Sequence, residues 1–327
     1  MSNEPAPDAL PDLARRLVRT SFGARATEPQ PLAAGAWSQA FELRIDGAEA
    51  VLRIGAHGSD FAKDEVVARA AVPGLPVPPV LARGAIGSWH YAVSARVHGT
   101  AFDDLSAADA ELTLPSLLTT LDAVGKIDLA GTAGYGIWTP NGQTPYNSWA
   151  EALLAIGTET SRVPGWRAAL TDSEFGLEPV EMGLATLASL TTYLPDERRM
   201  IHGDLLSRNV LAAHGTVAAV LDWGNALYGD SLYDAAWLIY WWPWYPRWRG
   251  VDVYAALQDH WRTTGPLPAH LHERLHAYLI HIGLDAIAYC TFQRRWDEVQ
   301  ANIDIVTALA RSAPGDYALN SPTIRST

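Results

Sequence analysis

The hydrophobic and polar positions of this chain follow two periodicities, one before about residue 98 and another after it. In the first stretch, short alternating runs predict strands at 31–34, 40–45, 50–54, 80–82 and 91–97. Asp46-Gly47 supplies a hairpin turn after the second strand, and Gly84–Gly87 supplies a turn after the fourth. The segment 60–71 has helical spacing, begins at an N-cap of Ser59 or Asp60, and stands between the third and fourth strands.

Beyond Gly99 the apolar positions recur mostly every three or four residues, which is typical of helices. This spacing predicts helices at 112–127, 149–156, 180–193, 271–290 and 297–311. A block of strand character interrupts them at 200–201, 210–211 and 217–221, with His214-Gly215 as a turn. Residues 131–145 are rich in Gly, Pro and Asn and are expected to form a loop.

Together these patterns predict an α+β fold of two lobes. Residues 1–30 are expected to form a tail, loose over 1–12, and a short amphipathic helix at 15–22. Residues 31–98 are expected to form a small β-rich N-lobe, and residues 99–327 a larger, mainly helical C-lobe. A chain of 327 residues is long for one compact core, which also favours two packed lobes.

The charge balance narrows the classes of function. The formal net charge is −12, from 36 acidic and 24 basic residues. Such a surface repels nucleic acid and anionic membranes, so a nucleic-acid-binding protein is disfavoured. The charge attracts cations, which fits a cationic substrate but does not establish one, and simple solubility is the more ordinary explanation. The most apolar uncharged run, 235–246, contains Pro243 and is too short to span a bilayer.

Two further features indicate where the protein works. The N-terminal residues have neither the basic start nor the apolar segment of a signal peptide. The single cysteine, Cys290, cannot form an internal disulfide and lies in no nucleophile motif. We therefore expect a cytoplasmic protein without membrane association, and we expect it to be monomeric.

The most informative segment runs from Met200 to Trp223, MIHGDLLSRNVLAAHGTVAAVLDW. Asp204 and Asn209 lie in a loop between two predicted strands, and Asp222 ends the next strand. Phosphoryl transfer needs a carboxylate that accepts the proton of the attacking hydroxyl, and oxygen ligands for Mg²⁺ on the nucleotide phosphates. Asp204 fits the first role, and Asn209 with Asp222 fits the second. Each residue alone is common in caps and turns, but the whole spacing is not expected by accident.

This HGD-L-x-x-x-N pattern followed by LDW resembles the catalytic and metal-binding loops of the aminoglycoside phosphotransferase family. The resemblance implies a two-lobed protein-kinase-like fold, ATP and Mg²⁺ as cofactors, and a small-molecule hydroxyl as acceptor. It implies that Asp204 is the catalytic base and that Asn209 and Asp222 bind magnesium. His202 would hold the loop by hydrogen bonding.

The N-lobe resembles the family less closely. The sequence GAWSQAF at 35–41 stands where the family has its phosphate-covering turn, but it lacks a full G-x-G-x-x-G. The resemblance implies that Gly35, Trp37 and Ser38 cradle phosphates through their backbone.

Arg53 stands on the third strand where protein kinases carry lysine. By the resemblance it contacts the α- and β-phosphates, with Glu65 on the next helix as its ion-pair partner. Lys63 is a rival for the phosphate contact. The segment 94–97 would be the hinge, where Ala95 and Val97 offer backbone groups to adenine.

Within the family the resemblance is greatest to phosphotransferases of hygromycin B, and it extends over nearly the whole chain. The acceptor implied is a cationic aminoglycoside, and the role implied is resistance. Aromatic faces stack on sugar rings and attract ammonium groups, and carboxylates pair with amines. The candidate substrate residues are Asp230, Trp241, Trp244 and Asp285.

Several alternatives remain at this stage. Trp241 and Trp244 are as well explained by packing within the helical lobe, and Asp230 by bracing of loops. Residues 139–176 have their own pattern, which leaves the acceptor open to a macrolide, a choline-like compound or a sugar. A nucleotide-binding module without turnover is a further alternative, although such modules typically lose one of the three catalytic-loop residues.

Overall fold

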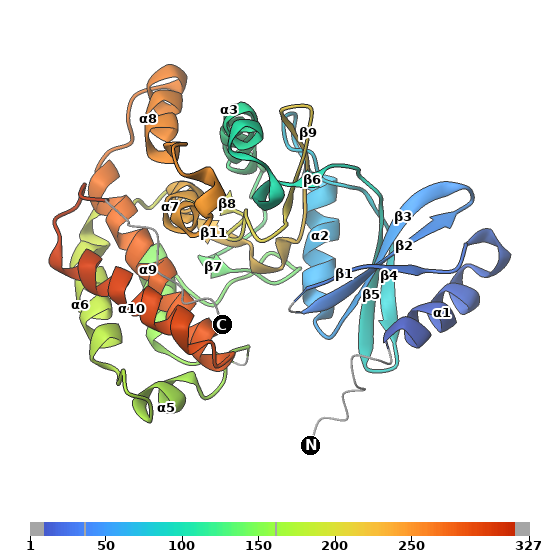
Figure 1. Cartoon of the computed structure of the whole chain (residues 1–327), viewed down its shortest axis with the longest axis horizontal. Coiled ribbons are helices and arrows are strands. Elements are labelled where there is room, and N and C mark those ends of the chain that lie inside the picture. The colour runs from blue at the N-terminus through green and yellow to red at the C-terminus, as the bar shows by residue number, and fades with distance from the viewer. Residues whose placement is uncertain (1–9, 36, 161, 318–327) are drawn as a thin grey trace.

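The computed structural model describes residues 10–35, 37–160 and 162–317, and it divides into two lobes (Figure 1). The N-lobe is a five-stranded antiparallel sheet in the order β1-β2-β3-β5-β4. Its strands are β1 (Gln30–Ala34), β2 (Ser38–Ile45), β3 (Ala48–Gly55), β4 (Val80–Ile86) and β5 (Trp89–Ala95). The α+β, two-lobed fold class is confirmed. Residues 1–9 of the expected tail lie outside the described residues.

The two hairpins of the N-lobe show what turn chemistry predicts and where it is wrong. Asp46 and Gly47 both have positive φ, 50° and 81°, as a two-residue hairpin turn between β2 and β3 requires. The second turn is not at Gly84, because β4 continues through that residue to Ile86. A Cβ on Gly84 would lie 2.9 Å from the ring of Tyr91, so this glycine makes room for an aromatic ring across the strands.

A helix that the sequence analysis separated from the N-lobe belongs to that lobe's core. Helix α1 (Leu10–Ser21) buries Leu10, Leu17 and Val18 against the sheet, in one cluster with Phe41. The helix also begins five residues earlier than predicted. Its apolar face explains both corrections, because a stripe of this kind must be covered by another element.

Helix α2 (Gly58–Ala70) lies against β4 and β5, on the side of the N-lobe that faces the C-lobe (Figure 1). It buries Phe61 and Val67, but also the charged residues Lys63 and Asp64. Charged side chains are seldom fully buried without partners. Their partners belong to the catalytic centre described below.

The C-lobe is built around one long central helix. Its helices are α3 (Ala107–Val124), α4 (Trp149–Leu154), α5 (Trp166–Thr171), α6 (Glu178–Leu190), α7 (Leu232–Trp241), α8 (Val253–Thr264), α9 (Leu271–Phe292) and α10 (Trp296–Arg311). Helix α9 packs against α5, α6, α7 and α10. The sequence analysis missed α5, α7 and α8. Helix α7 is apolar on nearly all sides and α5 has only six residues, so neither gives a clear amphipathic pattern.

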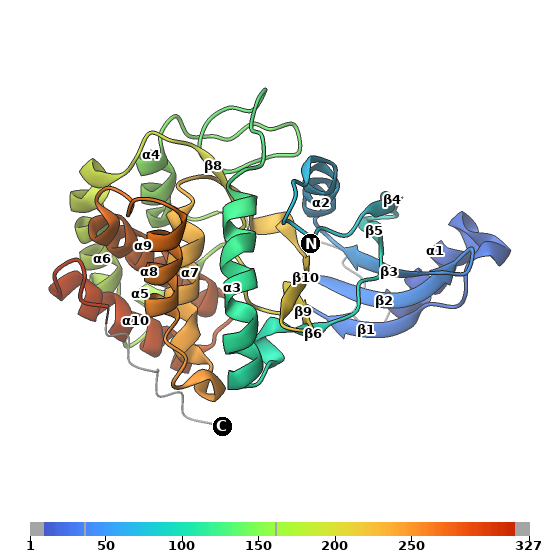
Figure 2. The same cartoon turned by 90° about the horizontal axis from the view of Figure 1, so that it is seen from above.

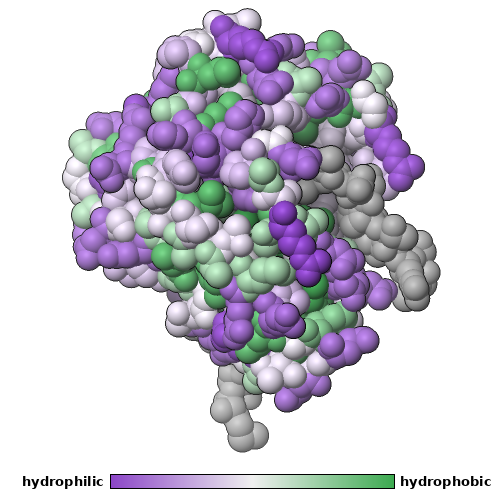
Figure 3. All heavy atoms as spheres, turned by 90° about the vertical axis from the view of Figure 1, so that its left-hand side faces the viewer, coloured by the Kyte–Doolittle hydropathy of each residue, from purple (hydrophilic) through white to green (hydrophobic). Residues whose placement is uncertain are grey.

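Helix α9 is also long and apolar enough to cross a membrane by length and composition. In this fold, 78% of its most apolar window is buried inside the C-lobe. Figure 3 shows the outer face of that lobe, where hydrophilic residues are interspersed among hydrophobic ones. The apolarity of α9 is thus accounted for by its place in the core.

Two small sheets carry the loops of the catalytic centre at the boundary between the lobes (Figure 2). One contains β10 (Thr216–Val220), β9 (Val210–Ala213) and β6 (Thr100–Ala101), and the other contains β7 (Gly136–Ile137), β11 (Leu227–Gly229) and β8 (Arg199–Ile201). The loop from β8 to β9 carries Asp204, and the turn after β10 carries Asp222. The predicted strands of this block are confirmed.

Candidate active site

The Asp204 loop is held from beneath by a buried neutral histidine. His202 is fully buried, its Nε2 lies 2.9 Å from the carbonyl oxygen of Leu221, and its Nδ1 accepts the Asp204 N–H at 3.1 Å. Burial lowers the pKa of His202 to about 4, so the ring is neutral at physiological pH. Asp234 accepts the backbone N–H groups of His202 and Gly203, each at 2.9 Å. These contacts support the predicted positioning role of His202.

The Asp204 carboxyl group is placed where it can act as a base near neutral pH. Burial and, as a smaller contribution, the negative charge of Asp222 raise its pKa to about 7. Hydrogen bonds from Ser207, Asn225 and Asn209 oppose that shift. A base is most effective when its pKa lies near the working pH. The surroundings of Asp204 therefore suit proton removal from an alcohol.

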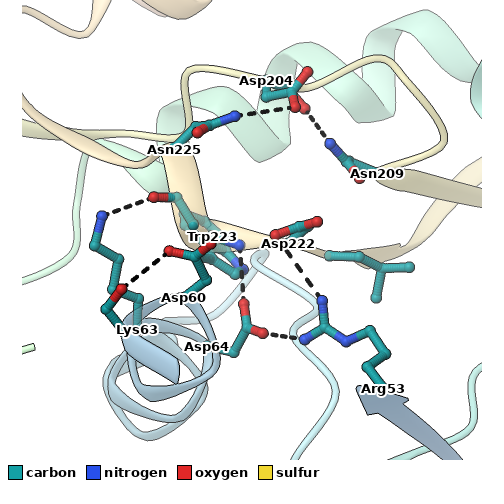
Figure 4. Close-up of polar contacts among 12 residues, drawn as sticks. Arg53, Asp60, Lys63, Asp64, Asp204, Asn209, Asp222, Trp223 and Asn225 are labelled. Atoms are coloured by element: carbon teal, nitrogen blue, oxygen red, sulfur yellow. Dashed lines mark hydrogen bonds and ion pairs between the residues drawn. The ribbon is translucent and has the colours of Figure 1, made fainter. Parts of the chain in front are cut away.

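Asn209 is hydrogen-bonded to Asp204, and Asp222 lies between Asp204 and Arg53 (Figure 4). The Asn209 Nδ2 donates to the Asp204 carbonyl oxygen at 2.9 Å, which leaves its own oxygen directed elsewhere. Asp222 has φ of 59°, a left-handed conformation uncommon outside glycine, and its side chain is 48% exposed. Mg²⁺ takes oxygen ligands and is typically bound through one or two carboxylates together with substrate phosphates. One accessible carboxylate and one amide oxygen fit that requirement.

Arg53 approaches this pair of loops from β3. Its Nη1 lies 3.9 Å from the Asp222 carboxylate, and its guanidinium packs 5.2 Å from the ring of Phe61. Its side chain is 19% exposed, so the head is available to an anion beside Asp222. This placement supports the predicted phosphate contact of Arg53.

The predicted ion-pair partner of Arg53 is wrong. Arg53 pairs with Asp64, whose other oxygen accepts the Trp223 N–H at 2.9 Å. Glu65 instead bonds Arg83 and Arg69 on the outer surface of α2. Consecutive helical residues point about 100° apart, so only one of the two carboxylates can face β3.

The rival phosphate ligand is placed elsewhere as well. Lys63 is buried, and its Nζ donates to the carbonyl oxygen of Gly224 at 2.8 Å. Burial lowers the pKa of Lys63 to about 8. Figure 4 shows Lys63 beneath the turn that follows Asp222, on the side of α2. Lys63 therefore ties α2 to the metal-binding turn rather than reaching toward the nucleotide.

The two neighbouring carboxylates of α2 should differ sharply in their effect on stability. Asp64→Asn removes the nearest counter-ion of the largely buried Arg53, leaving Asp222 at 3.9 Å, and is expected to lower the free energy of unfolding by up to about 3–5 kcal/mol. Glu65→Gln removes only surface ion pairs and should cost about 0–1 kcal/mol. Urea denaturation of the two variants measures both values. Equal losses would contradict the assignment of Asp64 as the partner.

The phosphate-covering turn folds back onto β3. The Gly35 N–H donates to the Ser38 carbonyl oxygen at 2.8 Å, and a Cβ on Gly55 would lie 2.6 Å from the Trp37 carbonyl oxygen. The Trp37 ring crosses toward the C-lobe, with its centroid 6.4 Å from that of Tyr289 on α9. The Gly35 N–H is thus already engaged within the turn, and the backbone contacts of Gly35, Trp37 and Ser38 with phosphates stay predictions. One residue of this turn, at position 36, lies outside the described residues.

The predicted hinge has one backbone group already in use. The Ala95 N–H donates to the Pro79 carbonyl oxygen at 3.0 Å. An adenine contact from Ala95 must therefore come from its carbonyl group. Val97 lies two residues further on, in the connection to the C-lobe. Both residues stay predicted adenine contacts.

The predicted substrate residues Trp241 and Asp285 lie on α7 and α9, two helices that pack together and that we call the acceptor wall. Tyr233 on α7 and His281 on α9 are joined by a hydrogen bond of 2.9 Å between the Tyr233 oxygen and Nδ1 of the imidazole. One turn further along each helix come Trp237 and Asp285. Asp285 is exposed to solvent on one side. The protein around its carboxylate still displaces enough water to raise its pKa to about 6.

The predicted tryptophans continue this wall. The Trp241 ring centroid lies 5.8 Å from that of Trp237 and 5.1 Å from that of Trp244. All three are half-buried, and their indole N–H groups have no hydrogen-bond partner among the described residues. A buried indole N–H usually has one. These nitrogens are buried, so they do not indicate a ligand, and substrate contact by Trp241 and Trp244 stays a prediction.

Asp230 does not face a substrate, which corrects the prediction. Its carboxylate is 3% exposed and accepts two hydrogen bonds from Arg274, at 2.8 and 2.7 Å. It also accepts the hydroxyl of Tyr278. A carboxylate with these partners is fully engaged within the fold, so Asp230 braces the start of α7 against α9.

Four residues of this centre escaped the sequence analysis. They lie around the predicted ones and are Asn225, Trp237, His281 and Tyr289. For three of them a signal exists, because 281, 285 and 289 recur every four residues, as do 233, 237 and 241. Asn225 carries no such pattern, since its role depends on how a turn packs against a distant loop.

Known proteins resemble this chain over most of its length. The phosphotransferase enzyme family matches residues 28–277. Hygromycin-B 4-O-kinase of Escherichia coli is 30% identical over 286 residues, which are 87% of this chain and 81% of that kinase.

Solved structures give the same picture. A thermostable mutant of aminoglycoside phosphotransferase APH(4)-Ia, in ternary complex with AMP-PNP and hygromycin B, matches with a TM-score of 0.79 and 28% identity. The match covers 92% of this chain and 99% of that one. Macrolide 2'-phosphotransferase of Brachybacterium faecium, 16% identical, matches with a TM-score of 0.57 over 94% of this chain and 99% of its own, and so shares the fold.

Proposed function

This chain belongs to the phosphotransferase enzyme family, and we propose that it transfers the γ-phosphoryl group of ATP to a hydroxyl of an aminoglycoside of the hygromycin B type. The observation that carries this proposal is the placement of Asp204. It lies with Asn209 and Asp222 (Figure 4), and its charge acts on Tyr289, which is one helical turn from Asp285 on α9. A base, metal ligands and an amine-binding group thus meet in one place. The relatives named above support the same nucleotide and acceptor.

The residues of this chain divide the reaction among them. Asp204 orients the acceptor hydroxyl and takes its proton as the oxygen attacks the γ-phosphorus, while the bond to the β–γ bridging oxygen breaks and ADP leaves. Arg53 holds the phosphates from the N-lobe. Asn209 and Asp222 would hold Mg²⁺, which supplies positive charge to the phosphate oxygens when bound. The turn at Trp37 and Ser38 covers the phosphates and excludes water.

The acceptor wall suits a sugar that bears amines. Asp285 offers a carboxylate to an ammonium group in surroundings that strengthen the attraction. Trp237 and Trp241 offer aromatic faces to sugar rings and cations. The net charge of −12 draws a polycation toward the protein. Asp230 has no part in this wall.

A panel of acceptors tests the proposal. ADP release from Mg·ATP is followed with hygromycin B, other aminoglycosides, a macrolide, choline and simple sugars. We expect hygromycin B-like compounds to stimulate release most. Stimulation by the macrolide or choline alone would assign a different acceptor. No stimulation, with nucleotide still bound, would favour a module without turnover.

Asp285 predicts the pH dependence of aminoglycoside use. Its pKa of about 6 means that the carboxylate is ionised above pH 6 and becomes neutral as the pH falls below it. We therefore expect kcat/KM for the aminoglycoside to fall as pH drops through 6, because a neutral carboxyl group does not attract an ammonium group. A hydrogen bond to a charged group contributes about 1.5–3 kcal/mol, so Asp285→Asn should raise KM about 10–100-fold.

Steady-state kinetics between pH 5 and 8 measures this effect. The base Asp204, with its pKa of about 7, gives both proteins a fall of kcat/KM below pH 7. In Asp285→Asn the further fall through pH 6 should be absent, since its titrating group has gone. If wild type and variant share the same acid limb, Asp285 is not the amine-binding group.

The cellular setting follows from the reaction. ATP and Mg²⁺ are available in the cytoplasm, so we place the enzyme there and expect resistance of the cell as its consequence. We also propose that the monomer is the active form. The base, the metal ligands and the acceptor wall all come from one chain.

A further inference from the structure

A cation from the segment between α4 and α5 reaches the catalytic centre and touches three separate elements. Arg162 donates through Nη2 to the Asp60 carboxylate on α2, and through Nη1 to Oδ1 of Asn225 at 3.0 Å. Its guanidinium lies 5.6 Å from the ring of Trp37 in the phosphate-covering turn. One C-lobe side chain therefore joins the N-lobe helix, the phosphate-covering turn and the turn after Asp222.

The groups around Arg162 are held in place independently of it. Glu159 accepts the backbone N–H groups of Gly165 and Arg167, each at 2.9 Å, which closes the segment that carries Arg162. On the other side, a Cβ on Gly224 would lie 2.9 Å from Cγ of Asp60, so α2 and the turn are in close contact there. The Arg162 side chain is 26% exposed. Its position is thus built into the fold.

The consequence concerns the amide of Asn225. A guanidinium has hydrogen-bond donors only. It therefore favours the amide orientation in which Oδ1 of Asn225, the acceptor, faces Arg162. The Asn225 Nδ2 is then turned toward Oδ2 of Asp204, at 3.4 Å. The backbone beneath cannot shift freely, because a Cβ on Gly203 would lie 3.0 Å from the Asn225 carbonyl oxygen. Rotation of the amide is the freedom that remains, and Arg162 removes it.

We propose that Arg162 is a positioning residue for phosphoryl transfer: it fixes the Asn225 amide so that its N–H group orients the Asp204 carboxylate toward the acceptor hydroxyl. The proposal rests on the role of Asp204 in the proposed function. Arg162 lies in the 158–165 segment, outside the catalytic motifs, and would be a further residue on which kcat depends. Arg162 acts through Asn225 and touches no reacting atom.

Two variants of Arg162 and one matched control test this role. Arg162→Met keeps the length of the side chain and removes its donors, and Arg162→Lys keeps the charge but cannot bridge Asp60 and Asn225 at once. A misplaced catalytic group costs up to about 10²-fold, so we expect Arg162→Met to lower kcat about 10–100-fold with the KM for ATP nearly unchanged. Arg162→Lys should fall between Arg162→Met and wild type.

The control is Arg167→Met, five residues further along the chain. Arg167 donates to the Gly157 carbonyl oxygen at 3.0 Å and lies over the ring of Trp166. It has no contact with the catalytic loop among the described residues. Arg167→Met should therefore leave kcat unchanged. Equal losses of kcat in both methionine variants would overturn the proposal.

A double-mutant cycle shows whether Arg162 acts through Asn225. Asn225→Leu removes the amide and should lower kcat as much as Arg162→Met does. If the two residues form one unit, the double variant loses no more than either single variant. If the loss of kcat in the double variant equals the product of the two single losses, the proposal is overturned, since Arg162 would then act independently of Asn225.

A spectroscopic readout separates this proposal from the proposed function. The side-chain amide signals of Asn225, identified by their loss in Asn225→Leu, should shift in Arg162→Met and stay in place in Arg167→Met. This needs no acceptor. If wild type phosphorylates no aminoglycoside but the amide signals shift, the proposed acceptor is wrong and the contact stands. Unshifted signals would overturn the positioning role even in an active kinase.

Discussion

Replacing Asp204 by Asn is expected to lower kcat for phosphorylation of the aminoglycoside by about 10²–10⁴-fold, the usual contribution of a general base. Asn has the same shape and still accepts a hydrogen bond, but it cannot take a proton from the acceptor hydroxyl. In the wild type, burial makes the largest contribution to raising the pKa of the carboxyl group to about 7, so the carboxylate is basic enough to take that proton. Coupled ADP release measures kcat, and calorimetry shows whether Mg·ATP and acceptor still bind.

A carboxylate on the surface of the same lobe is the control for this substitution. Asp104 pairs with Arg208 at 2.9 Å, is 41% exposed, and lies outside the proposed machinery. Asp104→Asn makes the same chemical change and should leave kcat within about twofold, as expected for a surface ion pair. A near-normal kcat in Asp204→Asn would remove Asp204 from the role of base.

Asp222→Ala is expected to reduce kcat/KM for Mg·ATP by about 10³-fold, because a metal ligand supports several kcal/mol of charge stabilisation in the transition state. The loss should be partly recovered at high Mg²⁺ concentration. Asp222 also faces Arg53, at 3.9 Å, so its removal frees that guanidinium to bind phosphate more tightly in the absence of metal. Titration of activity with Mg²⁺, at fixed ATP, measures both effects.

The dependence on Mg²⁺ distinguishes the two carboxylates. Asp204→Asn should lower activity at every Mg²⁺ concentration without moving the midpoint of the titration. Asp222→Ala should move the midpoint to higher Mg²⁺. An unchanged midpoint in Asp222→Ala would mean that Asp222 is not a metal ligand.

Local signals in the sequence predicted much of the fold. Asp46-Gly47 specified the β2–β3 hairpin because both residues accept positive φ. The spacing of Asp204, Asn209 and Asp222 predicted the catalytic loops, because Asn209 and Asp222 flank the β9–β10 hairpin and Asp204 lies in the loop just before it. Such features depend on residues that are neighbours in the chain, so sequence patterns can predict them.

Other features depend on which helix faces which strand, and there the sequence was insufficient. Asp64 and Glu65 are adjacent carboxylates of similar chemistry, and only the rotation of α2 about its axis decides which one meets Arg53. Asp230 was predicted to contact the substrate, but its carboxylate pairs with Arg274, which is 44 residues away in the sequence.

The acceptor wall shows the same division. Trp241 and Asp285 were selected for their chemistry, but their alignment on parallel faces follows from the contact between Tyr233 and His281. That contact is one of several that fix the relative register of α7 and α9, among them the close approach of Tyr240 to Gly283. Trp237 was not predicted as a site residue, because its sequence context is that of a core residue. Its place in the acceptor wall follows from this register.

The central claim is that Asp204 directs the γ-phosphoryl group of ATP onto a hydroxyl of a hygromycin B-like aminoglycoside. The most direct measurement is phosphorus NMR of the product formed from Mg·ATP and hygromycin B by wild type and by Asp204→Asn. We predict one phosphomonoester signal, coupled to a sugar proton, that grows in step with ADP in wild type and is nearly absent in the variant. ADP without a phosphorylated sugar, or equal product from both proteins, would contradict the account.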